Sequence, residues 1–557
     1  MIKVDGNNIY ADTRTLKATF DRGVLVSLVR KSDGQTFIQA NSEGLSPLWL
    51  VYSSRELVPL RGETGDQVAC LPINDHSAEV RFNSWNGDGL LCISEDQETG
   101  DLTIEPSGYA SRPGLRACRW VMSGIGKELE LIAPFYQGIR LPLDDALIRN
   151  SFWNWPIRWE AGMAILQGKE GGFWLHCQDD RYRYKALQVG TKDDAHCLGL
   201  DTEAYGPLDN NLSAGGIMWR INVYDGDWKV PAGCYSNWLK ATYRLDRAAR
   251  PDWLGDIRLA LSWCPTDPAI LDALAKIISP ANILLHVPGW RCDPYDENYP
   301  TFAPSDAGKS FIQKAQSMGF RAMPHCNSID MDPTHPVYAY IRDFQYRSLE
   351  SKRVEGWTWD NGRVKPVPES NAGRLKHRDK KTMVKVHPGL GMWRSILAEN
   401  VRQAVENLSL DLVFLDVTLC TWNLHNCLID NTTPTEGMKR IIAKAASLKE
   451  NLVVGGEGRN EITMQEEGFA QVHLFTGSAD AMERLLNNGL CPLNEFMFGS
   501  WCRSFGYSGL SGRNRDEHLR MKVHLALGTI PTLTIGSAAE LENPNEAVKE
   551  MITMANG

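Results

Sequence analysis

The strongest constraint on the fold is a regular alternation of strand-like and helix-like segments from about residue 257 to the C-terminus. Short apolar runs followed by amphipathic stretches of roughly 10–15 residues predict βαβ units and a parallel sheet. The predicted strands cover residues 257–263, 282–287, 321–324, 412–417, 451–457, 471–475, 495–499 and 528–535. The predicted helices cover residues 268–278, 306–318, 391–407, 434–449 and 540–554, and Gly319 is the expected C-cap of the second helix. About eight strands in some 300 residues predict a complete (β/α)8 barrel of the TIM type.

The first 250 residues differ from the rest, because short apolar runs are separated there by Gly, Asn and Asp. Residues 16–38 contain strand-like runs around a turn candidate at 32–34, which indicates β-hairpins. Residues 231–242 are the candidate for a closing helix. We therefore expect a multidomain α+β protein. A large β-sandwich would cover residues 1–250, and a barrel would cover 251–557, with an insertion at about 347–390.

Composition limits the partners of the chain. With 43% hydrophobic and 23% charged residues it is an ordinary globular protein. Its net charge is −9, whereas nucleic-acid binders usually carry a basic surface. The sequence contains no run of about 18 apolar residues, so we expect no membrane span. The 13 cysteines form no CxxC pair, which favours free thiols in a reducing compartment over a metal site. We expect a cytoplasmic protein without a cofactor, unless a leader has been removed, and the oligomeric state stays open.

Two predicted barrel strands each end in one carboxylate. The apolar run 412–415 leads into Asp416, and the run 452–456 leads into Glu457. Such runs are typical of buried parallel strands, and barrel enzymes place their chemistry at the C-terminal strand ends. Because neighbouring strands lie about 4.8 Å apart, the two carboxyl groups can approach to about 5–5.5 Å. That separation predicts a retaining glycoside hydrolase, whereas about 6.5–9.5 Å predicts an inverting one.

The surroundings of the two carboxylates suggest their roles. Asp416 is short and held by its strand, so it is the predicted nucleophile, which must stay ionised and well positioned. Glu457 is the predicted general acid/base, because burial and a nearby anion raise the pKa of such an acid. Glu461 is a rival acid that we expect beyond the strand end. The structural alternative for either carboxylate is a helix N-cap or a surface ion pair.

Aromatic, amide and imidazole side chains follow the predicted strand ends, and such groups can stack on sugars or bind their hydroxyls. The predicted substrate-binding residues are Trp290, His325, Asn327, Asp360, His387, Trp422, Asn423 and Arg459. Asp360 and His387 lie in the insertion, which is typical of a lid or binding loop. A structural role stays open for each residue: barrel-capping tryptophans, core histidines, or a solvated loop with aromatic anchors.

The order of these features resembles the retaining α-glycosidases of glycoside hydrolase families 101 and 129, and their uncharacterised relatives. Those families comprise endo- and exo-acting α-N-acetylgalactosaminidases. Residues 414–416 are similar to the nucleophile strand, Glu457 to the acid/base, and residues 16–38 to the opening hairpins of the sandwich. The resemblance implies a galactose-mutarotase-like β-supersandwich, with the nucleophile on the fourth barrel strand and the acid/base on the fifth.

The same resemblance implies a carbohydrate substrate, an oligosaccharide or glycoconjugate with an α-linked N-acetylgalactosamine or galactose-type sugar. Family 101 enzymes carry further β-domains after the barrel and are typically exported, whereas this chain ends about where the barrel closes. We therefore expect exo-action on small or imported glycans.

Three other interpretations of the site stay open. An inverting glycosidase requires only a wider separation of the two carboxyl groups. An acidic sugar such as sialic acid would be favoured if Arg291, Arg459 and Arg503 converged on the barrel mouth. A non-catalytic carbohydrate-binding protein would also account for the many aromatic residues.

Overall fold

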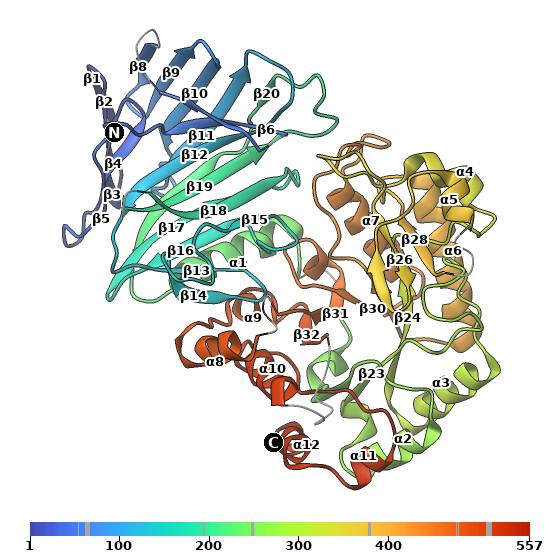
Figure 1. Ribbon diagram of the computed structural model, residues 1–557. Helices are drawn as coiled ribbons and strands as arrows, with labels where there is room; N and C mark the ends of the chain where they lie inside the picture. The colour runs from blue at the N-terminus through green and yellow to red at the C-terminus, as the bar shows by residue number, and fades with distance from the viewer. Residues whose placement is uncertain are drawn as a thin grey trace. The chain divides into compact units, whose positions relative to one another are not determined.

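The structure, a computed structural model, describes residues 1–53, 55–61, 67–192, 195–246, 250–376, 380–474, 476, 478–507 and 515–557. The chain divides into two compact units, Met1–Trp238 and Leu239–Gly557. Helix α1 (Lys229–Tyr243), which corresponds to the predicted closing helix, contains the boundary. Figure 1 shows the first unit in blue to green and the second in green to red.

The first unit consists of two large antiparallel sheets, as the sequence predicts. Among the described residues, 11 strands form one sheet and 10 form the other. The first sheet contains β1 (Ile2–Asp5), β2 (Asn8–Asp12), β3 (Leu16–Asp21), β4 (Val24–Arg30), β5 (Thr36–Gln39), β6 (Leu48–Tyr52), β7 (Leu57–Leu60), β12 (Leu115–Ile125), β15 (Phe152–Asn154), β18 (Lys185–Lys192) and β19 (Ala195–Glu203). The second contains β8 (Gln67–Asn74), β9 (Ser77–Ser84), β10 (Gly87–Glu95), β11 (Leu102–Ala110), β13 (Glu130–Ala133), β14 (Ile139–Pro142), β16 (Met163–Gln167), β17 (Gly171–Cys177), β20 (Ser213–Ala214) and β21 (Trp219–Asp225).

The two sheets enclose the core of this unit. Strands β11 and β12 belong to different sheets and contact each other. Trp120 on β12 and Trp219 on β21 are fully buried. The pairing of β3 with β4 and of β4 with β5 confirms the hairpins predicted for residues 16–38.

The second unit is built on a parallel sheet of eight strands among the described residues. In chain order these are β22 (Leu259–Leu261), β23 (Ile283–Val287), β24 (Arg321–Asn327), β29 (Leu412–Asp416), β30 (Val453–Glu457), β31 (Glu467–Val472), β32 (Arg503–Gly506) and β33 (Thr532–Leu533). From β22 to β32 each strand pairs with the next, and β33 pairs with β22. A parallel bridge between Phe505 and Ile530 joins the two ends of this sheet, which makes a TIM-like barrel.

Helices cover the outside of the barrel (Figure 1). They are α2 (Pro268–Leu274), α3 (Asp306–Met318), α6 (Gly391–Leu408), α7 (Pro434–Ala446), α8 (Ala479–Asn488), α9 (Leu493–Phe498), α10 (Arg515–Ala526), α11 (Ala539–Glu542) and α12 (Glu546–Asn556). Short 3-10 turns are η1 (Asp252–Asp256), η2 (Pro280–Asn282), η3 (Arg342–Phe344) and η4 (Thr463–Gln465). Helix α3 has the predicted bounds, and its C-cap Gly319 has a φ of +95°. No helix among the described residues is long and apolar enough to cross a membrane.

Two of the apolar clusters in the barrel unit pack the barrel itself. One fills the barrel interior with side chains from the strands, among them Ala260, Leu284, Met323, Phe414, Phe469 and Phe505. The other packs the outward-facing strand residues against the helices. The interior layer supports the polar groups above it at the carboxyl ends of the strands.

The segment between β24 and β29 contains the predicted insertion but begins near Asp330 rather than residue 347, and its described residues form a small four-stranded antiparallel sheet. Its strands are β25 (Asp330–Met331), β26 (Gly356–Asp360), β27 (Arg363–Lys365) and β28 (Thr382–Lys385), accompanied by α4 (Tyr338–Ile341) and α5 (Asn371–Lys376). Strand β25 follows β24 directly, so this sheet begins at the carboxyl end of the third barrel strand. Residues 377–379 of the insertion lie outside the described residues.

The predicted seventh strand at 495–499 is wrong. Residues 495–498 belong to helix α9, Gly499 is its C-cap, and the seventh strand is β32, Arg503–Gly506. The buried Leu493 and Met497 are four residues apart, which is the spacing of one helix face, whereas Phe496 is exposed. A short apolar run does not by itself distinguish the two periods. The sixth strand ends at Val472, and residue 475 of the predicted span lies outside the described residues.

Candidate active site

The alternation of side chains along the strands brings polar groups to the barrel mouth. Phe414 belongs to the interior cluster and Leu415 to the outer one, so the two-residue period places Asp416 on the interior side. The same count from the interior residue Val453 places Glu457 there. Applied to every strand before the eighth, the period gives a polar ring of Ser262, His286, His325, Asp416, Glu457, His473 and Tyr507.

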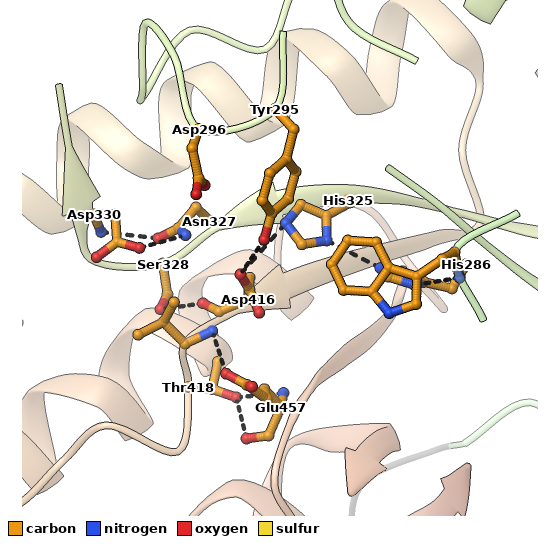
Figure 2. A network of polar contacts seen from close by, with 12 residues as sticks. His286, Tyr295, Asp296, His325, Asn327, Ser328, Asp330, Asp416, Thr418 and Glu457 are labelled. Atoms are coloured by element: carbon orange, nitrogen blue, oxygen red, sulfur yellow. Dashed lines mark hydrogen bonds and ion pairs between the residues drawn. The ribbon is translucent and has the colours of Figure 1, made fainter. Parts of the chain in front are cut away.

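Asp416 receives donors from two other elements (Figure 2). The hydroxyl of Tyr295 lies 3.4 Å from Oδ2, and His325 Nε2 lies 3.5 Å from the same oxygen. Its main-chain carbonyl accepts hydrogen bonds from the backbone N–H of Ser328 at 3.1 Å and from its hydroxyl at 2.6 Å. No hydrogen bond from a described residue reaches Oδ1. One carboxyl oxygen is therefore held, while the other is available to a ligand.

The electrostatic surroundings favour the ionised form of Asp416. Burial alone would raise its pKa, but the interactions with His325, and then His286, outweigh burial, so the pKa of Asp416 lies below its usual value. Burial and the Asp416 charge raise the pKa of Tyr295, so its hydroxyl stays protonated and can donate.

Glu457 lies on the other side of Asp416 (Figure 2). Its Oε2 accepts a hydrogen bond from the Val417 N–H at 3.2 Å, and its Oε1 lies 2.7 Å from His473 Nε2. Thr418 Oγ1 accepts from the Glu457 N–H at 2.8 Å. Val417 has a φ of +69°, an unfavourable region for a β-branched residue, in the turn that brings its N–H to Glu457.

The pKa of Glu457 moves in the opposite direction to that of Asp416. Burial raises it most, the charge of Asp416 raises it further, and His473 opposes both. Glu457 is therefore the member of the pair that holds a proton more readily. The two carboxyl groups have the opposite protonation preferences that acid/base catalysis requires.

The two glycines before Glu457 are required by close packing. A Cβ at Gly455 would lie 2.4 Å from Met323 Sδ, and one at Gly456 would lie 1.9 Å from Glu467 Oε1. Burial raises the pKa of Glu467 well above its usual value, so this carboxyl group is neutral beneath the site. The two glycines thus leave room for Met323 and Glu467 against strand β30.

Two further acids lie near the carboxylate pair (Figure 2). Asp330 contacts Lys385 Nζ at 3.2 Å and accepts from Asn327 Nδ2 at 2.8 Å. Burial, together with Asp296 and Asp416, raises the pKa of Asp330 to about 7 although Lys385 lowers it. Burial is also the main cause of the raised pKa of Asp296. Asp296 Oδ1 is buried and has no hydrogen-bond partner among the described residues, so it is a candidate acceptor for a ligand hydroxyl.

The insertion contributes three groups to this part of the site. Trp357 and Trp359 lie on one face of β26, and their indole N–H groups donate to Asp296 Oδ2 at 3.3 and 2.8 Å. Lys385 on β28 lies over the Trp357 ring at 4.2 Å. The predicted Asp360 is on the other face of β26 and pairs with Lys365 at 2.5 Å. The structure therefore brings the two tryptophans, and not Asp360, to the acids.

Trp290 and Asn327 support the backbone around His325. Trp290 is fully buried, and its indole N–H donates to the His325 carbonyl at 2.8 Å. Asn327 is buried too, and its Oδ1 accepts from the N–H groups of Ile329 and Asp330 at 3.1 and 2.8 Å. These contacts match the structural alternative for both residues, whereas His325 contacts Asp416 itself.

The remaining predicted residues, His387, Trp422 and Asn423, lie in or next to an aromatic cluster around Tyr346. His387 is fully buried, accepts from the Gly389 N–H at 2.9 Å, and has a pKa that burial lowers to about 4. Its ring meets Tyr346 edge-on at 5.5 Å, and Tyr346 also packs on the half-buried Trp422 at 6.2 Å. Asn423, the residue after Trp422, is also buried. The contacts of His387 with Tyr346 and the Gly389 N–H are those of a packing residue.

Arg291, Arg459 and Arg503 do not meet the condition for an acidic sugar, because they do not converge on the barrel mouth. Arg291 donates to the carbonyls of its own loop, at 2.9 Å for Pro294 and for Thr301. Arg459 is fully buried and pairs with Glu495 at 2.5 Å. Arg503 is the first residue of β32, so it lies at the amino end of the barrel, where it donates to the Ile257 carbonyl at 2.7 Å. The interpretation as a site for an acidic sugar loses its support.

Several residues of the site were not predicted as functional: Trp263, His286, Tyr295, Asp296, Asp330, Trp357, Trp359, Lys385, His473 and Tyr507. His473 and Tyr507 follow directly on β31 and β32, so the strand-end rule that found Asp416 could have found them. Their rings stack at 4.2 Å. Among the described residues, no group of three or more His, Cys, Asp or Glu side chains is arranged to hold a metal ion.

Residues 218–466 match a family model described as a domain of unknown function, DUF6259. A comparison with curated protein sequences gives no match. The α-N-acetylgalactosaminidase NagBb from Bifidobacterium bifidum, solved with Gal-NHAc-DNJ, has a similar fold. The TM-score is 0.67 at 13% identity, over 100% of this chain and 92% of that chain.

Two α-galactosidase structures are also similar. The galactosidase domain of the α-galactosidase-sucrose kinase AgaSK has a TM-score of 0.50 at 10% identity, over 100% of this chain and 85% of that chain. The GH36 α-galactosidase AgaA from Geobacillus stearothermophilus has a TM-score of 0.50 at 9% identity, over 99% and 85%. At these identities the similarity shows a shared fold, a large β-sheet unit and a TIM-like barrel.

Proposed function

We propose that this protein is a retaining, exo-acting α-glycosidase, with Asp416 as nucleophile and Glu457 as general acid/base. One observation carries the proposal. Two carboxyl groups at the ends of adjacent parallel strands have pKa values shifted in opposite directions, downward for Asp416 and upward for Glu457. Paired titratable groups whose surroundings separate their pKa values mark the acid and the base of a site.

The contacts of each group suit the two steps of retention. Asp416 Oδ1 attacks the anomeric carbon while Tyr295 and His325 hold Oδ2. Protonated Glu457 gives its proton to the glycosidic oxygen as the bond to the leaving group breaks. Glu457 then removes a proton from water, which attacks the glycosyl–Asp416 ester and restores both carboxyl groups.

The charge of the site supports a neutral sugar. Asp296, Asp330, Asp416 and Glu457 line it with carboxyl groups, and Lys385 is engaged by Asp330. Carboxyl groups accept hydrogen bonds from sugar hydroxyls and disfavour a carboxylated sugar. The similar solved structures are an α-N-acetylgalactosaminidase and α-galactosidases. We therefore propose an α-linked N-acetylgalactosamine or galactose-type sugar at the non-reducing end of a glycan.

The test begins with matched α- and β-linked aryl glycosides of N-acetylgalactosamine, galactose and sialic acid. We expect hydrolysis of an α-linked neutral sugar, with the α-anomer as the first product by NMR. Asp416→Gly should lose about 10⁴-fold or more in kcat, and added azide should yield the β-glycosyl azide. Asp411→Asn is the matched control, because Asp411 precedes the same strand at its amino end and pairs with Lys449.

Three results would count against the proposal. A β-anomer as first product in the wild type would replace retention by inversion. Full activity in both Asp416→Gly and Glu457→Gln would remove the assigned pair. Absence of hydrolysis, with sugar binding intact, would favour a carbohydrate-binding protein.

A further inference from the structure

Two buried histidines connect the backbone of the first barrel strand end to Asp416 (Figure 2). The Trp263 N–H donates to His286 Nδ1 at 3.3 Å, and His286 Nε2 lies 3.0 Å from His325 Nδ1. His325 Nε2 lies 3.5 Å from Asp416 Oδ2. Both imidazoles are at most 1% exposed, so water does not exchange freely with these contacts.

The direction of both hydrogen bonds, Trp263 N–H to His286 and His286 to His325, follows from the first donor. A backbone N–H can only donate, so His286 Nδ1 must accept and carries no proton. Burial lowers the pKa of His286 well below its usual value, which leaves the ring neutral with its proton on Nε2. That proton faces His325 Nδ1, which must accept in turn. The His325 proton is therefore on Nε2, directed at Asp416.

The backbone conformation of Trp263 directs its N–H toward His286 Nδ1. Trp263 has a φ of +57°, a conformation that non-glycine residues rarely adopt. Its indole N–H is fixed by the Tyr507 carbonyl at 3.0 Å, and its ring meets the His286 ring edge-on at 5.3 Å. Strained backbone of this kind persists where the surrounding contacts over-determine it.

We propose that His286 is a positioning residue that fixes the tautomer of His325, with its proton on Nε2 and facing the nucleophile Asp416. The proposal rests on the function proposed above, because it assumes that Asp416 is the nucleophile. The opposite tautomer, with the proton on His325 Nδ1, would place that proton against the one on His286 Nε2.

Other charged or titratable groups also face His325 and Asp416. They are His286 on β23, Tyr295 and Asp296 in the following loop, Lys385 on β28, and Glu457 on β30. We call the contacts from Trp263 through His286 and His325 to Asp416 the relay. To assign a change in the pH profile to the relay, the variant must alter the relay alone. His286→Phe is such a variant, because it removes both ring nitrogens but keeps a ring beside Phe414. In the wild type the rings of His286 and Phe414 lie 4.5 Å apart. His286→Gln is the conservative variant, with an oxygen for the Trp263 N–H and an N–H for His325.

The experiment compares the pH dependence of kcat and KM for the wild type and both variants on the aryl glycoside that the wild type cleaves. In His286→Phe we expect kcat at pH 8 to fall about 10- to 100-fold with little change in KM, as for loss of one charge-assisted hydrogen bond. The acid limb of the profile should move to higher pH, because a displaced His325 lowers the pKa of Asp416 less. His286→Gln should stay within about threefold of the wild type and show less of this move.

The relay would be overturned if His286→Phe had the wild-type kcat and pH profile while Asp416→Gly was inactive. Activity of Asp416→Gly would instead overturn the proposed function. If His286→Phe does not fold, the wild type labelled with ¹⁵N-histidine decides. The His325 signal, identified by its loss in His325→Gln, should show a bare Nδ1 and a protonated Nε2. The opposite tautomer would refute the proposal.

Discussion

Asp416 and Glu457 make a controlled comparison within one site. They end adjacent strands, and each side chain is 12% exposed. Burial raises the pKa of both, yet the net shift is downward for Asp416 and upward for Glu457. Equal burial with opposite shifts means that the neighbours of each group decide its protonation.

The neighbours differ in kind. Asp416 faces two imidazoles and a phenol, and two of these donors reach the same oxygen. Glu457 faces a backbone N–H and one partly exposed imidazole, and it lies beside an anion. The fourth strand thus stabilises a carboxylate and the fifth strand a carboxylic acid. Changing the neighbours should therefore change the assignment of roles.

The largest expected loss of activity comes from removing the carboxyl group of Glu457, the proposed acid of the pair. Glu457→Ala should lose about 10³-fold in kcat/KM on a glycoside with an alkyl leaving group, which needs protonation. The loss in the first step should be less than about tenfold on a 2,4-dinitrophenyl glycoside, whose leaving group needs no proton. Pre-steady-state release of dinitrophenol measures that step. Equal losses on both substrates would exclude Glu457 as the acid, and Asp411→Asn is again the matched control.

A smaller effect is expected from Lys385, the cation that both carboxyl groups share. Its ammonium group lowers the pKa of Asp416 and of Glu457, and it contacts Asp330. Lys385→Met should move both limbs of the kcat/KM profile to higher pH, because both groups then hold their protons more strongly. We expect kcat at the optimum to fall about 10-fold, the size of one lost charge interaction.

The double variant Lys385→Met/Asp330→Asn controls for folding. A lone Asp330 carboxylate would be buried without a partner, so the single variant should have the lower Tm, and the amide should restore part of it. If the limbs of the profile stay in place in a folded Lys385→Met, the electrostatic account of this site is wrong.

Much of the barrel could be predicted because its signal is local. A continuous apolar run such as 412–415 is long enough to identify a buried strand. Ser305 and Gly319 mark the two ends of α3, because they cap the helix. The run at 495–499 failed, because four or five apolar residues fit a helix face as well as a strand. Its misplacement also hid Tyr507, which follows the true seventh strand.

The site was predictable only where a side chain follows a strand directly. Asp416, Glu457 and His325 belong to that class, and the barrel period orients them. Asp296 lies in an irregular loop, and Lys385 reaches Asp330 through a sheet built from the insertion. No periodicity along the chain encodes such tertiary contacts. Arg291 and Arg503 failed for the related reason that their partners are main-chain carbonyls, which every sequence offers, whereas Arg459 pairs with the distant Glu495.

A still smaller effect is expected at His473, which opposes the upward shift at Glu457. His473→Phe keeps a ring on Tyr507 but removes the contact of Nε2 with Glu457 Oε1. Since His473 lowers the pKa of Glu457, its loss should move the alkaline limb to higher pH and leave the Asp416 limb unchanged. The shift should be less than about one pH unit for a partly exposed partner. His473→Gln keeps a donor and should show less of it, and a shift to lower pH would contradict the assignment.

The smallest effect sharpens the Asp416 side of the comparison. Trp290→Phe removes the indole N–H that donates to the His325 carbonyl, and it keeps most of the buried ring. An unsatisfied buried carbonyl costs about 1–3 kcal/mol, so the Tm of the barrel should fall by a few degrees. Because the His325 ring keeps His286 and Asp416 as its neighbours, kcat should stay within about threefold and neither pH limb should move. Thermal unfolding and one pH profile test this together. A shifted acid limb would mean that the indole, as well as His286, sets the position of His325 against the nucleophile.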